Sequence, residues 1–321
     1  MSYYSSNVDA GSTIASIVGI LEVPLEGMSV LQADLILVLA SALWGGGFPA
    51  TKWALLNMQP CSFLAWRFLI ATLLLVIIFP RKAFPRTRFE WTFAASMGTL
   101  LGLGYVFQTI GLQYTSTGKA GFITGLTIVF VPVIDAVANR RGISPKNALG
   151  IFTSFLGLSF LCITTSYKLE STDLWIVACA VSFAFQIVGL SRWGAKVSVL
   201  AFTTAQLFFS FVVSAVGALI LEAPTLTHDT TTWFCLAYTA ILATALTFVI
   251  QTKVQPYTSP THAALIYALE AVFATIMGWL WLDEHLTTRD LLGCALIGLG
   301  IVIVEIKGRA KPEGVTGEGY S

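Results

Sequence analysis

Residues 108–116 read QTIGLQYTS, and residues 251–259 read QTKVQPYTS. The two stretches share Gln, Thr, Tyr, Thr and Ser at the same spacing, 143 residues apart, and without any gap the same offset pairs Gly157 with Gly300. Apolar matches arise readily by chance in an apolar chain, but polar matches at a fixed spacing do not. The chain therefore contains an internal duplication.

The chain on both sides of these stretches is strongly apolar. Of its 321 residues 56% are hydrophobic and 11% are charged, and its mean hydropathy is +0.79. A soluble domain usually carries about 25% charged residues, so this chain has too few charges to cover a soluble body. Its net charge of +1 provides no basic field for nucleic acid. We expect a helical membrane protein whose surroundings are the lipid bilayer.

Ten apolar segments between polar breaks are long enough to cross a bilayer. Each is predicted to be a helix, because only a helix satisfies its own backbone hydrogen bonds in lipid. The segments are 34–56, 62–79, 91–113, 119–138, 147–165, 173–191, 198–221, 232–254, 262–282 and 290–306. The predicted organisation is an N-terminal extension (1–33), two five-helix repeats (34–165 and 173–306) and a tail (307–321).

Five spans per repeat is an odd number, so the second repeat enters the membrane from the opposite side. Thirteen of the 18 Lys and Arg residues fall on the side of the two chain termini, four fall on the other side, and Arg67 lies within a span. Because cytoplasmic loops are enriched in Lys and Arg, both termini are predicted to be cytoplasmic, in the cell (inner) membrane. Two inverted repeats around a central cavity are a recurrent transporter architecture.

Motifs in both repeats resemble the EamA-type members of the drug/metabolite transporter superfamily. They are Trp44-Gly45-Gly46-Gly47-Phe48, Arg67-Phe68, Tyr114-Thr115-Ser116, Leu269-Glu270, and the stretch 283–287 followed by Gly293 and Gly298. The resemblance covers about residues 34–306. It implies ten helices around a central cavity that carry small organic solutes across the cytoplasmic membrane.

Two positions depart from the family pattern. Family members often have Pro where Ala271 follows Glu270, so a less kinked ninth helix is expected here. The first-repeat position that matches Glu284 is Arg141, which argues against an acidic role common to both repeats at that loop.

Charged groups within the hydrocarbon cost at least about 2.5–3.5 kcal/mol on insertion scales and usually face a cavity or a partner. Arg67 either attracts an anionic group of a substrate or anchors the second helix on backbone carbonyls. Glu270 is either a proton carrier or a hydrogen-bonded carboxyl that fixes helix packing. Asp135 has Arg140 and Arg141 about one turn beyond it, which favours a local ion pair or snorkelling over gating.

Uncharged polar and aromatic side chains complete the predicted substrate site. Gln108 and Gln251 are repeat mates whose amides both donate and accept hydrogen bonds; hydrogen bonding between helices is the alternative. Tyr105 lies beside the first amide, and Tyr267 precedes the ninth-span carboxyl by one helical turn. Trp44 either stacks on substrate or, with its triple glycine, permits close helix packing. The predicted substrate-binding residues are Trp44, Arg67, Tyr105, Gln108, Gln251, Tyr267 and Glu270.

No cofactor or metal site is predicted. The five cysteines lie in or beside apolar runs and form no C-x-x-C pair, so we interpret them as apolar fillers. His228, His262 and His285 are far apart, with no HExxH or related spacing. Glycines 45–47 are not followed by Lys-Ser/Thr, so they form no phosphate-binding loop and ATP is not the direct energy source.

The predicted function is secondary transport, by alternating access, of small organic metabolites such as amino acids or related compounds, with protons as a coupling ion. Solute class and an outward direction follow from the resemblance alone. A sugar-phosphate or nucleotide-sugar exchanger is one alternative, but it requires more cations at cavity depth than Arg67, with Lys52 and Lys119 near the external ends. An intramembrane enzyme is another, but it requires clustered catalytic His, Asp or Ser residues, and no catalytic activity is expected.

Overall fold

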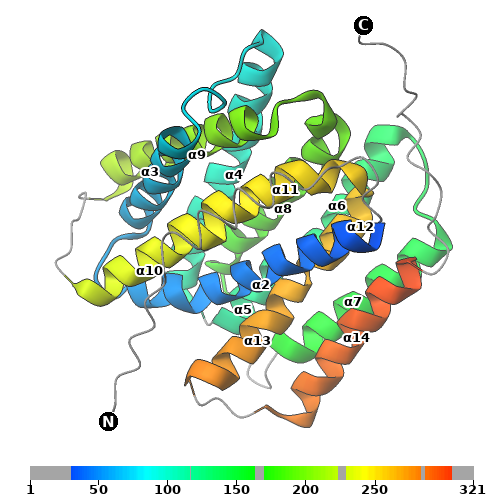
Figure 1. Ribbon diagram of the computed structural model, residues 1–321. Helices are drawn as coiled ribbons and strands as arrows, with labels where there is room; N and C mark the ends of the chain where they lie inside the picture. Colours follow the sequence, from blue (N-terminus) through cyan, green and yellow to red (C-terminus); the bar gives the residue numbers. More distant parts are fainter. Residues whose placement is uncertain (1–29, 116, 163–169, 223–228, 283–285, 306–321) are drawn as a thin grey trace, which may run out of the picture.

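The computed structural model describes residues 30–115, 117–162, 170–222, 229–282 and 286–305, and every regular element in these residues is a helix (Figure 1). The first repeat contains α2 (Val30–Ala54), α3 (Pro60–Ile78), α4 (Arg88–Tyr114), α5 (Thr117–Thr124), α6 (Thr127–Asn139) and α7 (Pro145–Cys162). The second contains α8 (Asp173–Trp193), η1 (Gly194–Lys196), α9 (Val199–Leu221), α10 (Thr230–Ala240), η2 (Ile241–Leu246), α11 (Thr247–Val254), η3 (Gln255–Tyr257), α12 (Pro260–Tyr267), α13 (Leu269–Leu282) and α14 (Thr288–Glu305). The first helix begins inside the predicted extension.

Eight helical stretches among the described residues are long and apolar enough to cross a membrane. They correspond to the predicted spans one to four and six to nine. The other two predicted spans are α7, which begins with Pro-Lys-Asn, and α14, which contains Arg289, Asp290 and Glu305. The all-α membrane class is confirmed, and these two further spans stay predictions.

The fourth and ninth spans are both interrupted, and at the same position of the repeat. The fourth breaks at Gly125 and Leu126, between α5 and α6, and the ninth breaks at Ala268, between α12 and α13. Gly125 and Ala268 are repeat mates at the 143-residue offset. The ninth helix is interrupted although Ala271 stands where family members often have proline, and the expectation that it is less kinked than theirs stays a prediction.

The last helices of the two repeats, α7 and α14, pack side by side through glycines (Figure 1). A Cβ atom at Gly157 would lie 2.6 Å from the carbonyl oxygen of Gly293, and one at Gly300 would lie 2.6 Å from that of Gly150. Since 157 and 300 are mates, as are 150 and 293, the interface is related to itself by a pseudo-two-fold axis. Close backbone approach through small residues is a common way to pack helices in membranes.

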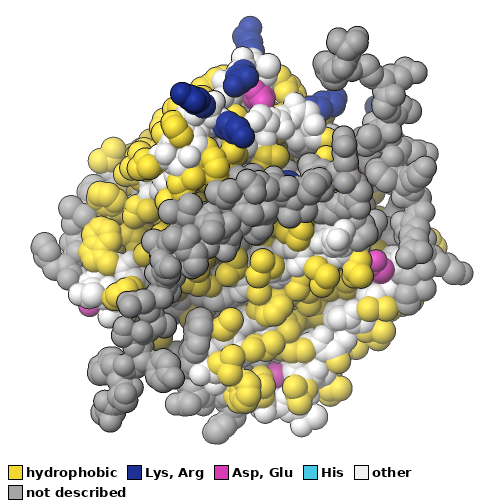
Figure 2. Space-filling model, viewed as in Figure 1, with side chains coloured by type: hydrophobic (Ala, Val, Ile, Leu, Met, Phe, Trp, Pro, Cys, Tyr) yellow, Lys and Arg dark blue, Asp and Glu magenta, His cyan; other side chains and the backbone are white. Residues whose placement is uncertain are grey.

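The surface fits a lipid environment. On the face shown in Figure 2, hydrophobic side chains predominate among the described residues, and Lys and Arg gather over the α3–α4 connection at one end. Leu56, Ile77, Ile220 and Phe234 are each more than 70% exposed. Large apolar side chains at that exposure require a partner or lipid, and their distribution around the helices favours lipid.

Candidate functional site

One cavity is lined by all seven side chains predicted to bind substrate, which come from both repeats. Its empty volume is about 950 Å³, including solvent at its opening. Thr124, Thr127, Phe183, Gln186 and Phe248 are among its other lining residues. The structure thus brings the predicted residues together, and their role in binding stays a prediction.

Arg67 of α3 is 3% exposed and binds the π-helical turn η2 of the other repeat. Its Nε donates to Thr244 Oγ1 at 2.7 Å, and its Nη2 donates to the Ala243 carbonyl oxygen at 3.2 Å. The guanidinium carbon lies 4.6 Å from the Tyr105 ring centroid, within the range of a cation–π contact. Arg67 therefore anchors α3 on the second repeat and also lines the cavity.

The π-helical turn η2 supplies a backbone acceptor to the cavity wall. The carbonyl oxygen of Ala243 accepts from Arg67 Nη2 and from Trp44 Nε1, the latter at 3.1 Å. Single π turns within α-helices frequently occur at functional sites. Sequence reasoning missed this turn, because its residues, Ile-Leu-Ala-Thr-Ala-Leu, contain neither Gly nor Pro.

Glu270 is the second residue of α13, directly after the break at Ala268. Tyr267, which was predicted to share a face with Glu270, is the last residue of α12, so the two residues lie on either side of this break. Both side chains still line the cavity. Within the described part of the chain, no hydrogen bond or ion pair engages the Glu270 carboxyl.

Amide side chains form a polar layer across the cavity. Gln108 Nε2 donates to Thr124 Oγ1 at 3.1 Å. Gln186 Nε2 lies 3.4 Å from both Gln251 Oε1 and Gln206 Oε1. Sequence reasoning missed Gln186, although a single amide in the apolar stretch around it is a usable signal of an inward-facing position.

Aromatic rings form the apolar part of the wall. Trp44 lies 5.2 Å from Tyr267 and 5.7 Å from Phe248, measured between ring centroids. Tyr105 lies 5.2 Å from Phe183 and 6.3 Å from Phe248. These edge-to-face and tilted contacts fix the rings against one another. The cavity therefore combines a rigid apolar wall with amide and charged groups, as small-molecule sites generally do.

The expected local ion pair of Asp135 with Arg140 or Arg141 is wrong. Asp135 Oδ1 instead lies 3.3 Å from Arg192 Nη2, at the end of α8 in the second repeat. Arg140 has a left-handed φ of 53° and ends α6. The chain therefore leaves the helix axis there, and the local arginines do not continue along the face that carries Asp135.

Several predicted features lie outside the described residues, namely Asp283, Glu284, His285, His228 and most of the N-terminal extension and tail. The described cysteine side chains, Cys61, Cys179, Cys235 and Cys294, are free thiols. The position of His262 in the sequence suggested an isolated side chain, but the structure gives it neighbours. It lies within 3.5 Å of carboxylate oxygens of both Asp34 and Glu305.

The sequence model of the EamA-like transporter family matches residues 31–163 and again residues 170–306. The chain belongs to the EamA-like transporter family. An uncharacterised transporter of Archaeoglobus fulgidus is 33% identical to it over 286 residues, which cover 88% of each chain. A chloroplastic WAT1-related protein of Arabidopsis thaliana is 25% identical over 84% of this chain and 67% of its own length. Protein PecM of Dickeya dadantii is 23% identical over 83% of this chain and 90% of its own.

A solved crystal structure, 18% identical in sequence, is similar to this EamA-like protein with a TM-score of 0.73. The match covers 86% of this chain and 97% of the other, and at that identity it establishes the fold alone. Together with the apolar helices, the family match makes this chain a multi-pass membrane transporter with a small-molecule substrate.

Proposed function

We propose that this EamA-like protein is a secondary exporter of small zwitterionic metabolites, such as amino acids or related compounds. The observation that carries the proposal is the charge of the cavity. Among the residues that the structure describes, its lining contains one cation, Arg67, and one carboxyl, Glu270, with amide groups in the same wall. A zwitterion presents a carboxylate and an ammonium group, which these two side chains complement.

The two charged groups remain available to such a solute. No ion pair joins Arg67 and Glu270 among the described contacts. The hydrogen bonds of Arg67 use Nε and Nη2. The other terminal nitrogen of the guanidinium, Nη1, is therefore the donor that would bind the carboxylate of the solute. Charge-assisted hydrogen bonds of this type are about twice as strong as neutral ones.

Alternating access is supported by the paired helix breaks. Discontinuous helices near the substrate site are typical of secondary transporters built from inverted repeats. Thr127, which follows the first break, and Glu270, which follows the second, both line the cavity. Movement of one repeat against the other about these breaks would open the cavity to each side in turn.

Proton coupling is the second part of the proposal, and Glu270 is the proposed carrier. Its carboxyl faces the cavity without a hydrogen-bond partner among the described residues, so a proton and a solute ammonium group would compete for the same oxygens. Binding of one would then release the other, which is the exchange that coupled export requires.

The orientation of the chain completes the proposal. We place both termini in the cytoplasm of a cell whose inner membrane holds the protein, on the distribution of Lys and Arg. Arg81, Lys82, Arg86 and Arg88, all exposed around the α3–α4 connection, then face the cytoplasm.

The cavity does not favour a sugar-phosphate or nucleotide-sugar substrate. Among its described lining residues Arg67 is the single cation. Lys52 Nζ donates to the carbonyl oxygens of Leu112 and Thr115, at 2.7 and 2.9 Å. Lys119 Nζ lies 2.8 Å from Asp173 Oδ2. A phosphate in the cavity would therefore contact one guanidinium, whereas a sugar-phosphate or nucleotide-sugar exchanger requires several cations.

The lining also favours a carrier over an intramembrane enzyme. Its described members include no His, Cys, Ser or Asp side chain. The serine and cysteine nucleophiles that a histidine base commonly activates are therefore missing from the described lining. Arg67, Glu270 and hydrogen-bonding amides suit binding and release of a solute.

The test is counterflow of labelled amino acids into liposomes that contain the purified protein. The proposal predicts saturable uptake of an unmodified zwitterion that is accelerated by internal unlabelled solute. Uptake of sugar phosphates alone would overturn the substrate class, and a chemically altered product would overturn the carrier function. Linear, non-saturable flux would indicate a channel and would contradict alternating access.

A further inference from the structure

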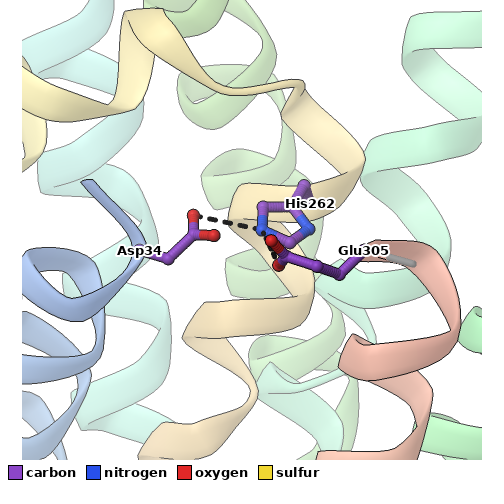
Figure 3. A group of neighbouring side chains, drawn as sticks. All are labelled: Asp34, His262 and Glu305. Carbon is purple, nitrogen blue, oxygen red and sulfur yellow. Dashed lines mark ion pairs between the residues drawn. The ribbon is translucent and has the colours of Figure 1, made fainter. Parts of the chain in front are cut away.

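Three side chains far apart in the sequence meet where three helices end. Asp34 lies in the first turns of α2, His262 in the first turn of α12, and Glu305 is the last residue of α14. Figure 3 marks ion pairs from the imidazole to both carboxyl groups. His262 Nε2 lies 3.1 Å from Asp34 Oδ1 and 3.5 Å from Glu305 Oε2. This cluster lies outside the solute cavity, since none of the three lines it.

Asp34 and His262 of this cluster are buried, whereas the Glu305 side chain is 43% exposed. Asp34 and His262 are 8% and 7% exposed. No hydrogen bond from a described residue reaches either carboxylate oxygen of Asp34 or Nε2 of His262. Buried polar atoms are normally satisfied, and an exception needs an explanation such as an ion or a water. The Nε2 atom of His262 and the carboxylate oxygens of Asp34 and Glu305 lie close together, so a cation among them would satisfy all of them.

The repeat provides an internal comparison. The mate of His262 at the 143-residue offset is Lys119, at the start of α5. Lys119 Nζ pairs with Asp173 Oδ2 at 2.8 Å, and Asp173 is the first residue of α8, which is the repeat counterpart of α2. One repeat therefore places an ammonium ion against an aspartate where the other places an imidazole against two carboxylates. The imidazole and the two carboxylates are groups that bind metal ions, and this arrangement has no lysine ammonium group to neutralise the carboxylates.

We propose that Asp34, His262 and Glu305 bind a divalent transition-metal ion of the zinc type. Zn²⁺ binds imidazole nitrogen and carboxylate oxygen at about 2.0–2.2 Å in tetrahedral sites, which places neighbouring ligand atoms about 3.4 Å apart. The ligand atoms here are 3.1 and 3.5 Å apart and all lie within 4.8 Å of one another. The mixed nitrogen and oxygen set suits zinc better than magnesium or calcium, which prefer oxygen alone.

Such an ion would link the repeats. Asp34 belongs to the first helix of one repeat, and His262 and Glu305 belong to the broken and last helices of the other. A metal ion binds all three ligands only in conformations that hold these helix ends together, so it would shift the population toward that conformation. This consequence concerns the conformation and does not depend on which solute is carried.

The test is titration of the full-length purified protein, in detergent and after chelator treatment, with ZnCl₂ and with CoCl₂. His228→Gln and His285→Gln are present throughout, because they remove the other two histidines of the chain. We expect one ion per protein, a rise in melting temperature with Zn²⁺, and a visible Co²⁺ spectrum of low coordination number. His262→Gln and Asp34→Asn should each weaken Zn²⁺ binding at least about 100-fold, since changes beyond the ligands themselves already cost 10–100-fold.

Asp135→Asn is the matched control, because Asp135 is likewise an acid near a helix end that is paired with a residue of the other repeat. It should leave Zn²⁺ affinity unchanged. No binding by the parent protein would overturn the proposal. Binding that persists undiminished in His262→Gln would overturn it as adventitious.

A second variant keeps the proposal testable if His262→Gln does not fold. His262→Cys replaces the imidazole by a thiolate, which also binds Co²⁺ and Zn²⁺. The Co²⁺ complex should then gain a sulfur-to-metal charge-transfer band in the near ultraviolet. A Co²⁺ spectrum identical to that of the parent protein would show that residue 262 is not a ligand.

Discussion

The two repeats build one cavity from equivalent positions but give those positions different chemistry. Gln108 and Gln251 are mates and both line the cavity, and so are Tyr105 and Phe248. The charged groups have no such equivalence. Glu270 has Thr127 as its mate, so the carboxyl belongs to the second repeat alone. The comparison shows that the symmetric backbone forms the cavity, whereas substitutions in single repeats determine its charge.

Arg67 shows the same asymmetry from the first repeat. Its approximate counterpart in the second repeat is the neutral Gln206 of α9, whose Oε1 lies 3.4 Å from Gln186 Nε2. The partner of Arg67 is also specific to one repeat, because η2 is a π turn where the equivalent helix α4 is continuous. The Arg67 guanidinium and the π turn that accepts its hydrogen bonds therefore occur together, although neither has an equivalent in the opposite repeat.

The largest expected effect tests the feature that the repeats share. Gly157→Leu should prevent the close packing of α7 on α14, because a Cβ there already meets the Gly293 carbonyl at 2.6 Å and the Ile297 nitrogen at 2.7 Å. Overpacking typically costs about 1–3 kcal/mol and sometimes more. Size-exclusion chromatography and thermal melting should show a poorly folded protein. Gly298→Leu, on the same α14 but with open space around it, is the control. Equal melting temperatures would contradict the glycine interface.

Arg67→Ala should remove most transport, because it deletes both the cation of the cavity and the link from α3 to η2. We expect about a 100-fold loss of kcat/KM in counterflow, equivalent to about 2.7 kcal/mol. Gln206→Ala, at the approximate counterpart position in the second repeat, should change kcat/KM less than threefold. If the two variants were equally impaired, the asymmetric placement of the cation would have no functional meaning.

Glu270→Gln should change the pH dependence of transport more than its rate at the optimum, because it removes the proposed proton site and keeps the shape of the side chain. The measurement is uptake across pH 5–8 with and without an imposed proton gradient. Thr127→Val, which alters the mate position without adding or removing a charge, should keep the parent profile. An unchanged profile in Glu270→Gln would remove this carboxyl from the coupling mechanism.

The smallest expected effect concerns the amides, where the two repeats match. Gln108→Ala and Gln251→Ala each delete one amide, and hydrogen bonds between membrane helices average about 0.6 kcal/mol, so KM should rise about threefold in each. Similar effects would extend the symmetry of the backbone to function. A tenfold difference between the two variants would show that the solute contacts one repeat preferentially.

Much of this architecture could be predicted without coordinates. Hydrophobic segments of bilayer length specify helices, because lipid offers no hydrogen bonds to an open backbone. The repeated Gln-Thr and Tyr-Thr-Ser residues indicated the internal duplication. Polar residues isolated within apolar spans were expected to face inward, because a polar group is costly in hydrocarbon. Arg67, Gln108 and Glu270 were identified in this way, and all three line the cavity.

Partners were less predictable than positions. Asp135 was expected to pair with arginines one turn away, but it contacts Arg192, 57 positions along the chain. Tyr267 and Glu270 both line the cavity, although α12 ends between them. For Asp135 the local rule of helical spacing failed where the helix itself stops, at Arg140.

The amino-acid order alone therefore determined the class of protein, the number and character of its apolar segments, and the set of polar residues that avoid lipid. These follow from the cost of placing each residue in hydrocarbon, which is a local property. Tertiary structure alone decided that Ala243 would present its carbonyl to Arg67, and that Asp34, His262 and Glu305 would meet. Those contacts depend on how helices from opposite repeats cross, and no spacing along the chain records that geometry.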